Sequence, residues 1–192
     1  MTVSEIETHI QKLLKPSRYK HSISVAKTAV ELARIHGADE DKAYLAALLH
    51  DCAKCYDDTE LFEKAEIYGI ELDSVSKNNP KLIHSYVGAY EAKSIYGIDD
   101  EEILDAIYYH TIGKADMSKL CAVIYIADAI EPLRSYDGVE ILRKASRTSL
   151  CEAVLKYTEM SIRHLIDRGE YIHPNAIETR NYYLEELLEQ RY

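Results

Sequence analysis

The stretch "LAALLHDCAKCYDD", residues 45–58, begins as an apolar helix and then places three reactive side chains close together. Its leucines and alanines recur at the spacing that turns one side of an α-helix toward a core. His50, Asp51 and Lys54 follow directly. The stretch therefore either ends an ordinary core helix or delivers these three side chains to a chemical site.

Helical periodicity extends over most of the chain on both sides of this stretch. Residues 19–37 have apolar side chains at helical spacing and end at Gly37, a suitable C-cap, while Asp39 can cap the helix that follows. Alternating strand patterns are nearly absent, so the sequence predicts an all-α fold. The expected helices span residues 3–14, 19–37, 38–54, 58–67, 82–96, 100–110, 117–130, 148–168 and 176–190, the last with Asn175 and Glu178 as a capping box.

Length and composition predict one domain. The 192 residues, 47% of them hydrophobic, can bury a full core, and no repeat or flexible linker divides them. We expect a single domain over residues 1–192, with a core of residues 18–131 on which C-terminal helices within 148–190 pack. Two stretches, 73–81 and 131–148, are expected to be irregular, and loops on a rigid scaffold are where binding groups tend to lie.

The charge of the chain restricts its partners. A formal net charge of −10 opposes binding to nucleic acid, which depends on Lys and Arg neutralising phosphates. A small phosphorylated ligand remains compatible if metal ions or a few cations reverse the local sign. We find neither a signal-type apolar run nor a segment able to cross a bilayer, so we expect a cytoplasmic protein without membrane contact. A homodimer remains open.

The four cysteines do not indicate a disulfide framework. Cys52 and Cys55 form a C-x-x-C pair, but no second pair completes a four-thiolate zinc site. We interpret this pair as part of helix packing.

Four histidines share a position near the end of an expected helix, and two aspartates interrupt apolar runs. An isolated buried Asp is costly unless it is paired, hydrogen-bonded or metal-bound. Imidazole nitrogens and carboxylate oxygens suit Fe, Mn, Zn and similar ions, and six donors exceed the need of one catalytic ion. Two ions are expected if these residues converge: His21, His50, Asp51, His84, His110 and Asp128.

Helix geometry assigns different roles to His50 and Asp51. Adjacent helical residues point about 100° apart, so both can face one crevice. Asp51 has two oxygens and is the natural bridge between two ions, whereas His50 would serve one. Each residue taken singly also has an ordinary explanation. A histidine at a helix end is often a cap, and Asp128 could form a salt bridge with Arg134 or a lysine.

The order of these residues, a His, an adjacent His-Asp pair, two further His and an Asp over positions 21–128, resembles the HD-domain metal-dependent phosphohydrolases. The variant it resembles has two additional histidines for a second metal ion. The finer motifs "HDCAK", "HSYVGA", "HTIGK", "ADAIEPLRSYDGV" and "YIHPNAIETRN" resemble the YqeK-type symmetrical bis(5′-nucleosyl)-tetraphosphatases. This similarity extends from about residue 18 to 181.

The resemblance implies an HD-domain helical bundle that hydrolyses diadenosine tetraphosphate to two ADP. It implies one ion held by His21, His50, Asp51 and Asp128, and a second held by Asp51, His84 and His110. The resemblance favours iron, although such ligands also admit Mn, Mg or Zn. The alternatives are an HD phosphohydrolase for another nucleotide, such as a nucleoside di- or triphosphate or a cyclic nucleotide, and a non-catalytic nucleotide sensor.

Substrate contacts are less strongly indicated than metal ligands. Lys54 and Arg134 are placed to contact phosphate, although both could be ordinary surface cations. Thr111 and Gly113 could let phosphate approach, or could simply end a helix, and the segment 171–175 is suggested for base or ribose by resemblance alone. Asp51 and Lys54 are the expected catalytic residues, and the expected substrate contacts are Lys54, His84, His110, Thr111, Arg134, Tyr171, His173, Asn175 and Arg180.

Overall fold

The computed structural model describes residues 1–189, which form eleven α-helices and two short 3-10 turns and contain no strand. The all-α prediction is confirmed. The helices are α1 (Val3–Leu13), α2 (Pro16–His36), α3 (Glu40–Leu49), α4 (Asp58–Ile67), α5 (Ser74–Asn78), α6 (Ile83–Ser94), α7 (Glu101–Tyr109), α8 (Lys119–Ile130), α9 (Val139–Ser146), α10 (Leu150–Asp167) and α11 (Pro174–Glu189), with 3-10 turns at Cys52–Cys55 and Pro80–Leu82.

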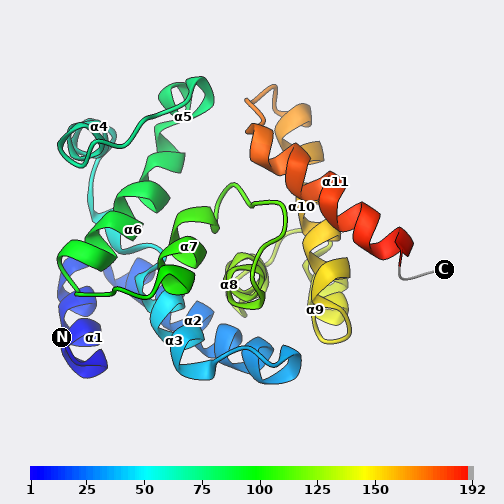
Figure 1. The fold of residues 1–192 in the computed structure, drawn as a ribbon, viewed down its shortest axis with the longest axis horizontal. Coiled ribbons are helices and arrows are strands. Elements are labelled where there is room, and N and C mark those ends of the chain that lie inside the picture. The colour runs from blue at the N-terminus through cyan, green and yellow to red at the C-terminus, as the bar shows by residue number, and fades with distance from the viewer. Residues whose placement is uncertain (190–192) are drawn as a thin grey trace.

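Helix α8 lies at the centre of the molecule. From Leu120 to Ile130 every residue of α8 except Asp128 is buried. It packs against α2, α3 and α7 on one side and against α9 and α10 on the other. In Figure 1, α8 is seen nearly end-on between these two groups of helices. A helix that is apolar all round belongs in a core, so the single partly exposed Asp128 marks where this core opens.

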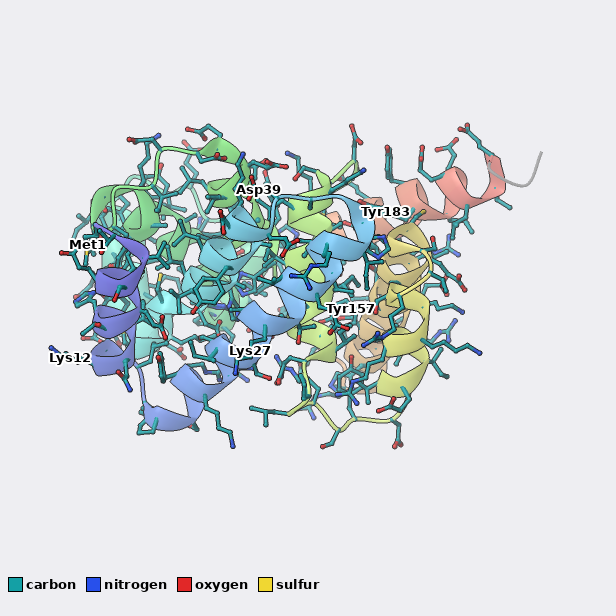
Figure 2. All side chains as sticks on the ribbon, turned by 90° about the horizontal axis from the view of Figure 1, so that it is seen from below. Met1, Lys12, Lys27, Asp39, Tyr157 and Tyr183 are labelled. Atoms are coloured by element: carbon teal, nitrogen blue, oxygen red, sulfur yellow. The ribbon has the colours of Figure 1, made fainter. Side chains whose placement is uncertain are left out.

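Helices α2 and α3 form an antiparallel pair whose turn follows the predicted signals. Pro16 occupies the first position of α2, and Gly37 ends the helix in the left-handed conformation at φ 70°. Asp39 caps α3 by accepting the backbone N–H groups of Asp41 and Lys42 at 2.9 and 3.0 Å. Figure 2 shows α2, marked by Lys27, running along the underside toward the turn at Asp39.

Both stretches expected to be irregular contain a helix. Asp73 caps the short α5 within 73–81, and α9 forms within 131–148. In α9 the apolar residues Val139, Leu142 and Ala145 recur every three positions and are buried. Packing of this stripe against the neighbouring helices stabilises a segment too short to persist alone.

Two other expected boundaries are also wrong. The helix expected over 38–54 ends at Leu49. At this point the Nδ1–H of His50 donates to the Ala47 carbonyl, and the chain continues into a 3-10 turn. The prediction of a capping box at Asn175 is also wrong, because α11 already begins at Pro174. The Asn175 N–H instead donates to His173 Nδ1 at 3.1 Å. Residue 190, the expected end of this helix, lies outside the described residues.

None of the helices within residues 1–189 combines the length and the apolar character needed to span a membrane.

Candidate metal centre

Five helices bring six nitrogen and oxygen donors to one place, most of them at helix ends. His21 comes from α2, and His50 and Asp51 follow the end of α3. His84 lies in the first turn of α6, His110 caps the C-terminus of α7, and Asp128 lies in the last turn of α8. All but Asp128 are buried, and the Asp128 side chain is 18% exposed.

The backbone fixes the orientation of three histidine rings. In each of them Nδ1 lies against the carbonyl oxygen three residues earlier, at 2.6 Å for His50, 2.5 Å for His84 and 2.7 Å for His110. A carbonyl oxygen can only accept, so Nδ1 carries the proton and donates it. Nε2 therefore keeps a lone pair, which is the state in which a histidine binds a metal.

His21 is oriented by a carboxylate instead. Its Nδ1 lies 3.1 Å from Oε1 of Glu131, which is itself buried. The other oxygen of Glu131 accepts the Leu133 N–H at 2.7 Å. A carboxylate behind a ligating imidazole fixes the ring and strengthens it as a ligand.

Asp51 directs one carboxylate oxygen to each of two histidine pairs. Its Oδ1 lies 3.1 Å from His84 Nε2 and 3.7 Å from His110 Nε2. Its Oδ2 lies 3.5 Å from His50 Nε2 and 3.7 Å from His21 Nε2. A carboxylate arranged in this way could hold one ion with each oxygen, and the bridging role of Asp51 stays a prediction.

The donor atoms need cations between them. His84 Nε2 and His110 Nε2 are 3.1 Å apart, and the tautomers above leave a bare lone pair on both. His21 Nε2 and His50 Nε2 are buried without a hydrogen-bond partner among the described residues. Such acceptors are costly to bury unless a cation joins them. Metal ions therefore fit these atoms, which form three sets lying within 4.8 Å of one another. The sets are His21, His50 and Asp51; Asp51, His84 and His110; and His50, His110 and Asp128, which spans the other two.

The protonation states of four donors, His50, His84, Asp51 and Asp128, suit metal binding. Burial lowers the pKa of His50 and His84 to about 4, so both are neutral at pH 7. Burial opposes ionisation of Asp51 and Asp128, but the hydrogen bonds and charges around them, including Arg134 beside Asp128, outweigh it and hold the pKa of both carboxyls below its ordinary value. For His21, burial lowers the pKa, but the carboxylates of Asp128, Asp51 and Glu131 outweigh it and raise the pKa above its ordinary value.

Arg18, Arg134 and Lys54 are cations that border the centre. Arg18 Nη1 lies 2.8 Å from Asp51 Oδ2, and Arg134 forms an ion pair with Asp128. The pairing of Asp128 with Arg134 that the sequence left open is thus present, and Asp128 Oδ1 also lies 3.1 Å from His21 Nε2. Lys54 is half-buried, and burial lowers its pKa. Within residues 1–189 its ammonium group has neither an ion pair nor a hydrogen bond.

Sequence reasoning missed Arg18 and Glu131. Arg18 lies three residues before His21 on α2, and Glu131 follows Asp128 by three residues. Side chains at this spacing share a helix face, so each could have been found by asking what lies one turn from a candidate ligand.

Some of the expected substrate contacts lie next to the loop that follows His110, whereas others contact residues elsewhere or face solvent. Thr111 Oγ1 is 3.1 Å from Ser85 Oγ, and the Asn175 amide donates to the Gly113 carbonyl at 3.1 Å, next to the loop that follows His110. His173 Nε2 lies 3.0 Å from Asp73 Oδ2 at the start of α5. Arg180 instead pairs with Glu159 at 3.1 Å, and Tyr171 is 59% exposed.

The C-x-x-C pair consists of free thiols. Cys52 is buried and donates to the Gly88 carbonyl at 3.6 Å, while Cys55 donates to the Cys52 carbonyl at 3.4 Å. Burial raises the pKa of both thiols, which keeps them protonated.

Comparison with known proteins assigns the family. Residues 18–133, which include all six donors, match the HD domain family. Proteins named symmetrical bis(5′-nucleosyl)-tetraphosphatase are 38% identical over 184 residues in Halalkalibacterium halodurans and 38% identical over 176 residues in Bacillus subtilis. These matches cover 94% and 90% of this chain, and 96% and 92% of the two relatives.

A solved structure from Clostridium acetobutylicum, described as a predicted HD superfamily hydrolase involved in NAD metabolism, has the same fold. It matches with a TM-score of 0.94 and 41% identity over 97% of this chain and 98% of that one. With the fold, the donor set and both relatives in agreement, the chain belongs to the HD domain family and, within it, to the family of the symmetrical bis(5′-nucleosyl)-tetraphosphatases.

Proposed function

We propose that the protein hydrolyses diadenosine tetraphosphate at its central phosphoanhydride bond and releases two molecules of ADP. The observation that carries this proposal is the arrangement at Asp51, where one carboxylate faces two separate histidine pairs. The names of the curated relatives support the choice of substrate and the symmetrical position of the cleavage.

We further propose that two metal ions occupy the centre. His21, His50, Asp51 and Asp128 would hold one, and Asp51, His84 and His110 would hold the other. When bound, two neighbouring ions supply Lewis acidity to a phosphoryl group and lower the pKa of water. Iron is the expected metal, and the same nitrogen and oxygen donors also accept Mn, Mg or Zn.

The remaining chemistry belongs to the cations of the chain. Lys54 has no competing partner in residues 1–189, so it can donate to a phosphoryl oxygen without breaking an ion pair, and it can stabilise charge that develops during cleavage. Arg134 forms an ion pair with Asp128, and Arg18 forms one with Asp51, at the edge of the centre. In a chain with a net charge of −10, these cations and the metal ions attract the tetraphosphate locally.

The other proposed nucleotide contacts are His84, His110, Thr111, Tyr171, His173, Asn175 and Arg180. The contact of Asn175 with Gly113 supports this set, since it places the start of α11 beside the loop after His110. A cytoplasmic location and a homodimer stay predictions.

A substrate panel tests the proposal. Metal-free protein is loaded with Fe(II), Mn²⁺, Mg²⁺ or Zn²⁺ in turn, and kcat/KM is measured for diadenosine tetraphosphate, ATP, ADP and cyclic AMP. We expect the highest kcat/KM for diadenosine tetraphosphate. A preference for ATP, ADP or cyclic AMP would identify a different HD phosphohydrolase, whereas bound metal with no turnover of any nucleotide would indicate a sensor.

A further inference from the structure

The C-terminal end of α8, the helix that carries Asp128, has all its backbone carbonyls satisfied. The last four carbonyls of an α-helix have no partner within the helix. Here one accepts a backbone N–H and three accept side-chain donors. The four pairs are Ala127 with the Glu131 N–H at 3.0 Å, Asp128 with Arg134 Nε at 2.9 Å, Ala129 with the Tyr136 hydroxyl at 2.8 Å, and Ile130 with Arg143 Nε at 2.9 Å.

Arg143 on α9 holds more than the helix end. Its Nη2 also donates to the carbonyls of Glu131 and Arg134, at 2.9 and 2.8 Å, so one planar guanidinium group joins three carbonyls of the segment 130–134. Its Nη1 forms an ion pair with the exposed Glu140. The guanidinium group presents its N–H donors in a fixed plane, which suits contact with several carbonyls at once. Its positive charge is also favourable at the negative, C-terminal end of a helix.

Among the described residues, the segment that Arg143 holds contacts donors of only one half of the proposed centre, His21 and Asp128. Glu131 fixes the ring of His21, and Arg134 pairs with Asp128. The other half is oriented differently, because His84 and His110 are fixed by carbonyls of their own chain neighbours, Lys81 and Ile107. Displacing the segment 130–134 would therefore affect the two halves unequally.

We propose that Arg143 is a positioning residue for the His21 and Asp128 half of the centre. It holds the segment 130–134 so that Glu131 and Arg134 keep His21 and Asp128 in place. Arg143 thereby sets the affinity for the ion at His21, His50, Asp51 and Asp128, and leaves the affinity of the ion at His84 and His110 unchanged. This inference rests on the proposed two-ion centre and is independent of the substrate.

The test compares Arg143→Met with Arg147→Met. Arg147 follows α9 directly, and within residues 1–189 its side chain pairs only with the exposed Glu31, at 2.8 Å with side-chain exposures of 62% and 52%. This ion pair should contribute little. The dissociation constants of two Mn²⁺ ions are measured by titration against a competing chelator. Thermal unfolding of each metal-free variant is recorded in parallel.

In Arg143→Met we expect one ion to bind as in wild type and the other to bind about tenfold or more weakly, the effect typical of losing a group behind a ligand. Excess metal should restore kcat, whereas a general loss of packing would not be reversed in this way. Arg143→Lys, which keeps the charge without the fork, should fall between wild type and Arg143→Met. Arg147→Met should bind both ions as wild type does.

Three results would overturn the proposal. Arg143→Met could bind both ions with wild-type affinity. It could also bind both ions more weakly by the same factor, together with a lower unfolding temperature, which would make Arg143 a purely structural residue. A wild type that binds only one ion would overturn the two-ion centre as well. If wild type binds two ions but leaves diadenosine tetraphosphate intact, the substrate proposal fails and the result for Arg143 stands.

Discussion

At the scale of single residues, Asp51 is where the two halves of the centre meet. Its Oδ1 faces His84 and His110, and its Oδ2 faces His21 and His50. Among the six donors, Asp51 places one oxygen on each half, while the rings of His50 and His110 also meet edge to face with centroids 5.0 Å apart. Asp51 should therefore be the least replaceable donor of the set.

Replacing Asp51 by Asn removes the charge and one of the two acceptor oxygens while keeping the shape. We expect loss of both ions and a fall in kcat/KM of more than about 100-fold, since removing even a group behind a ligand costs 10–100-fold. Metal content by elemental analysis and the hydrolysis rate check this. Asp105→Asn, at a 48% exposed carboxylate paired with Lys114, is the matched control and should behave as wild type. An Asp51→Asn variant that kept both ions would disprove the bridge.

Lys54 is the cation best placed to contact substrate, because it is half-buried beside the centre and its ammonium group is unpaired within residues 1–189. Replacing it by Met keeps the apolar stem and removes the charge. A charged hydrogen bond contributes about 1.5–3 kcal/mol, so we expect kcat/KM to fall about 10–100-fold with both ions retained. Steady-state kinetics measure this, with Lys93→Met, at an exposed ion pair with Glu101, as control. Equal kinetics in the two variants would exclude Lys54 from the site.

At the scale of elements, helix ends deliver the donors. His50 and His110 follow the last turns of α3 and α7, His84 lies in the first turn of α6, and Asp128 lies in the last turn of α8. Helix ends offer free carbonyls, and those carbonyls orient the rings of His50 and His110. A bundle of short helices thus builds a polar centre without breaking its apolar core.

The loop between α7 and α8 packs tightly against α11 at Gly113. Gly113 has φ +72°, and a Cβ there would meet the buried Thr179 Oγ1 at 2.6 Å. Gly69 has a similar φ of +65° with nothing within 4 Å, so Gly69→Ala reports the backbone strain alone. We expect Gly69→Ala to lower the free energy of unfolding by about 1–2 kcal/mol and Gly113→Ala by about 1–3 kcal/mol more. Urea unfolding measures both, and equal losses would contradict close packing of α11 on this loop.

Sequence alone predicted the elements whose signals are local. The helices around His21 and His84 follow from apolar periodicity. Gly37 marks the end of α2 and Asp39 the start of α3 through the chemistry of caps. Helix α9 was missed because it is stabilised by burial of its stripe against distant helices. Arg18 was missed for the same reason, since its partner Asp51 is distant in sequence. Arg143 was missed because its partners are backbone carbonyls of the segment 130–134, which no side-chain pattern marks.

At the scale of the whole molecule, the candidate metal centre joins α8 to the helices on one of its sides. Its donors come from α2, α3, α6, α7 and α8, while α9 and α10 support α8 from the opposite side. Ions that bind only the folded state should therefore stabilise the whole bundle rather than one loop.

Metal removal should lower the unfolding temperature. A ligand at 100 times its dissociation constant adds about 2.7 kcal/mol, and for a domain of this size 1 kcal/mol corresponds to about 2–4 °C. We expect chelation to lower Tm by about 5–10 °C for each ion lost, as measured by scanning calorimetry. The Asp51→Asn variant should show almost no shift with chelator. Identical Tm values for metal-loaded and metal-free wild type would contradict a centre that joins the bundle.

The most direct test of the account is product analysis of diadenosine tetraphosphate hydrolysis by metal-loaded protein in ¹⁸O-labelled water. Symmetrical cleavage predicts ADP as the sole nucleotide product, with one ¹⁸O atom on the terminal phosphate of one ADP for every two released. Formation of ATP and AMP, or recovery of intact substrate from protein shown to contain both ions, would contradict it.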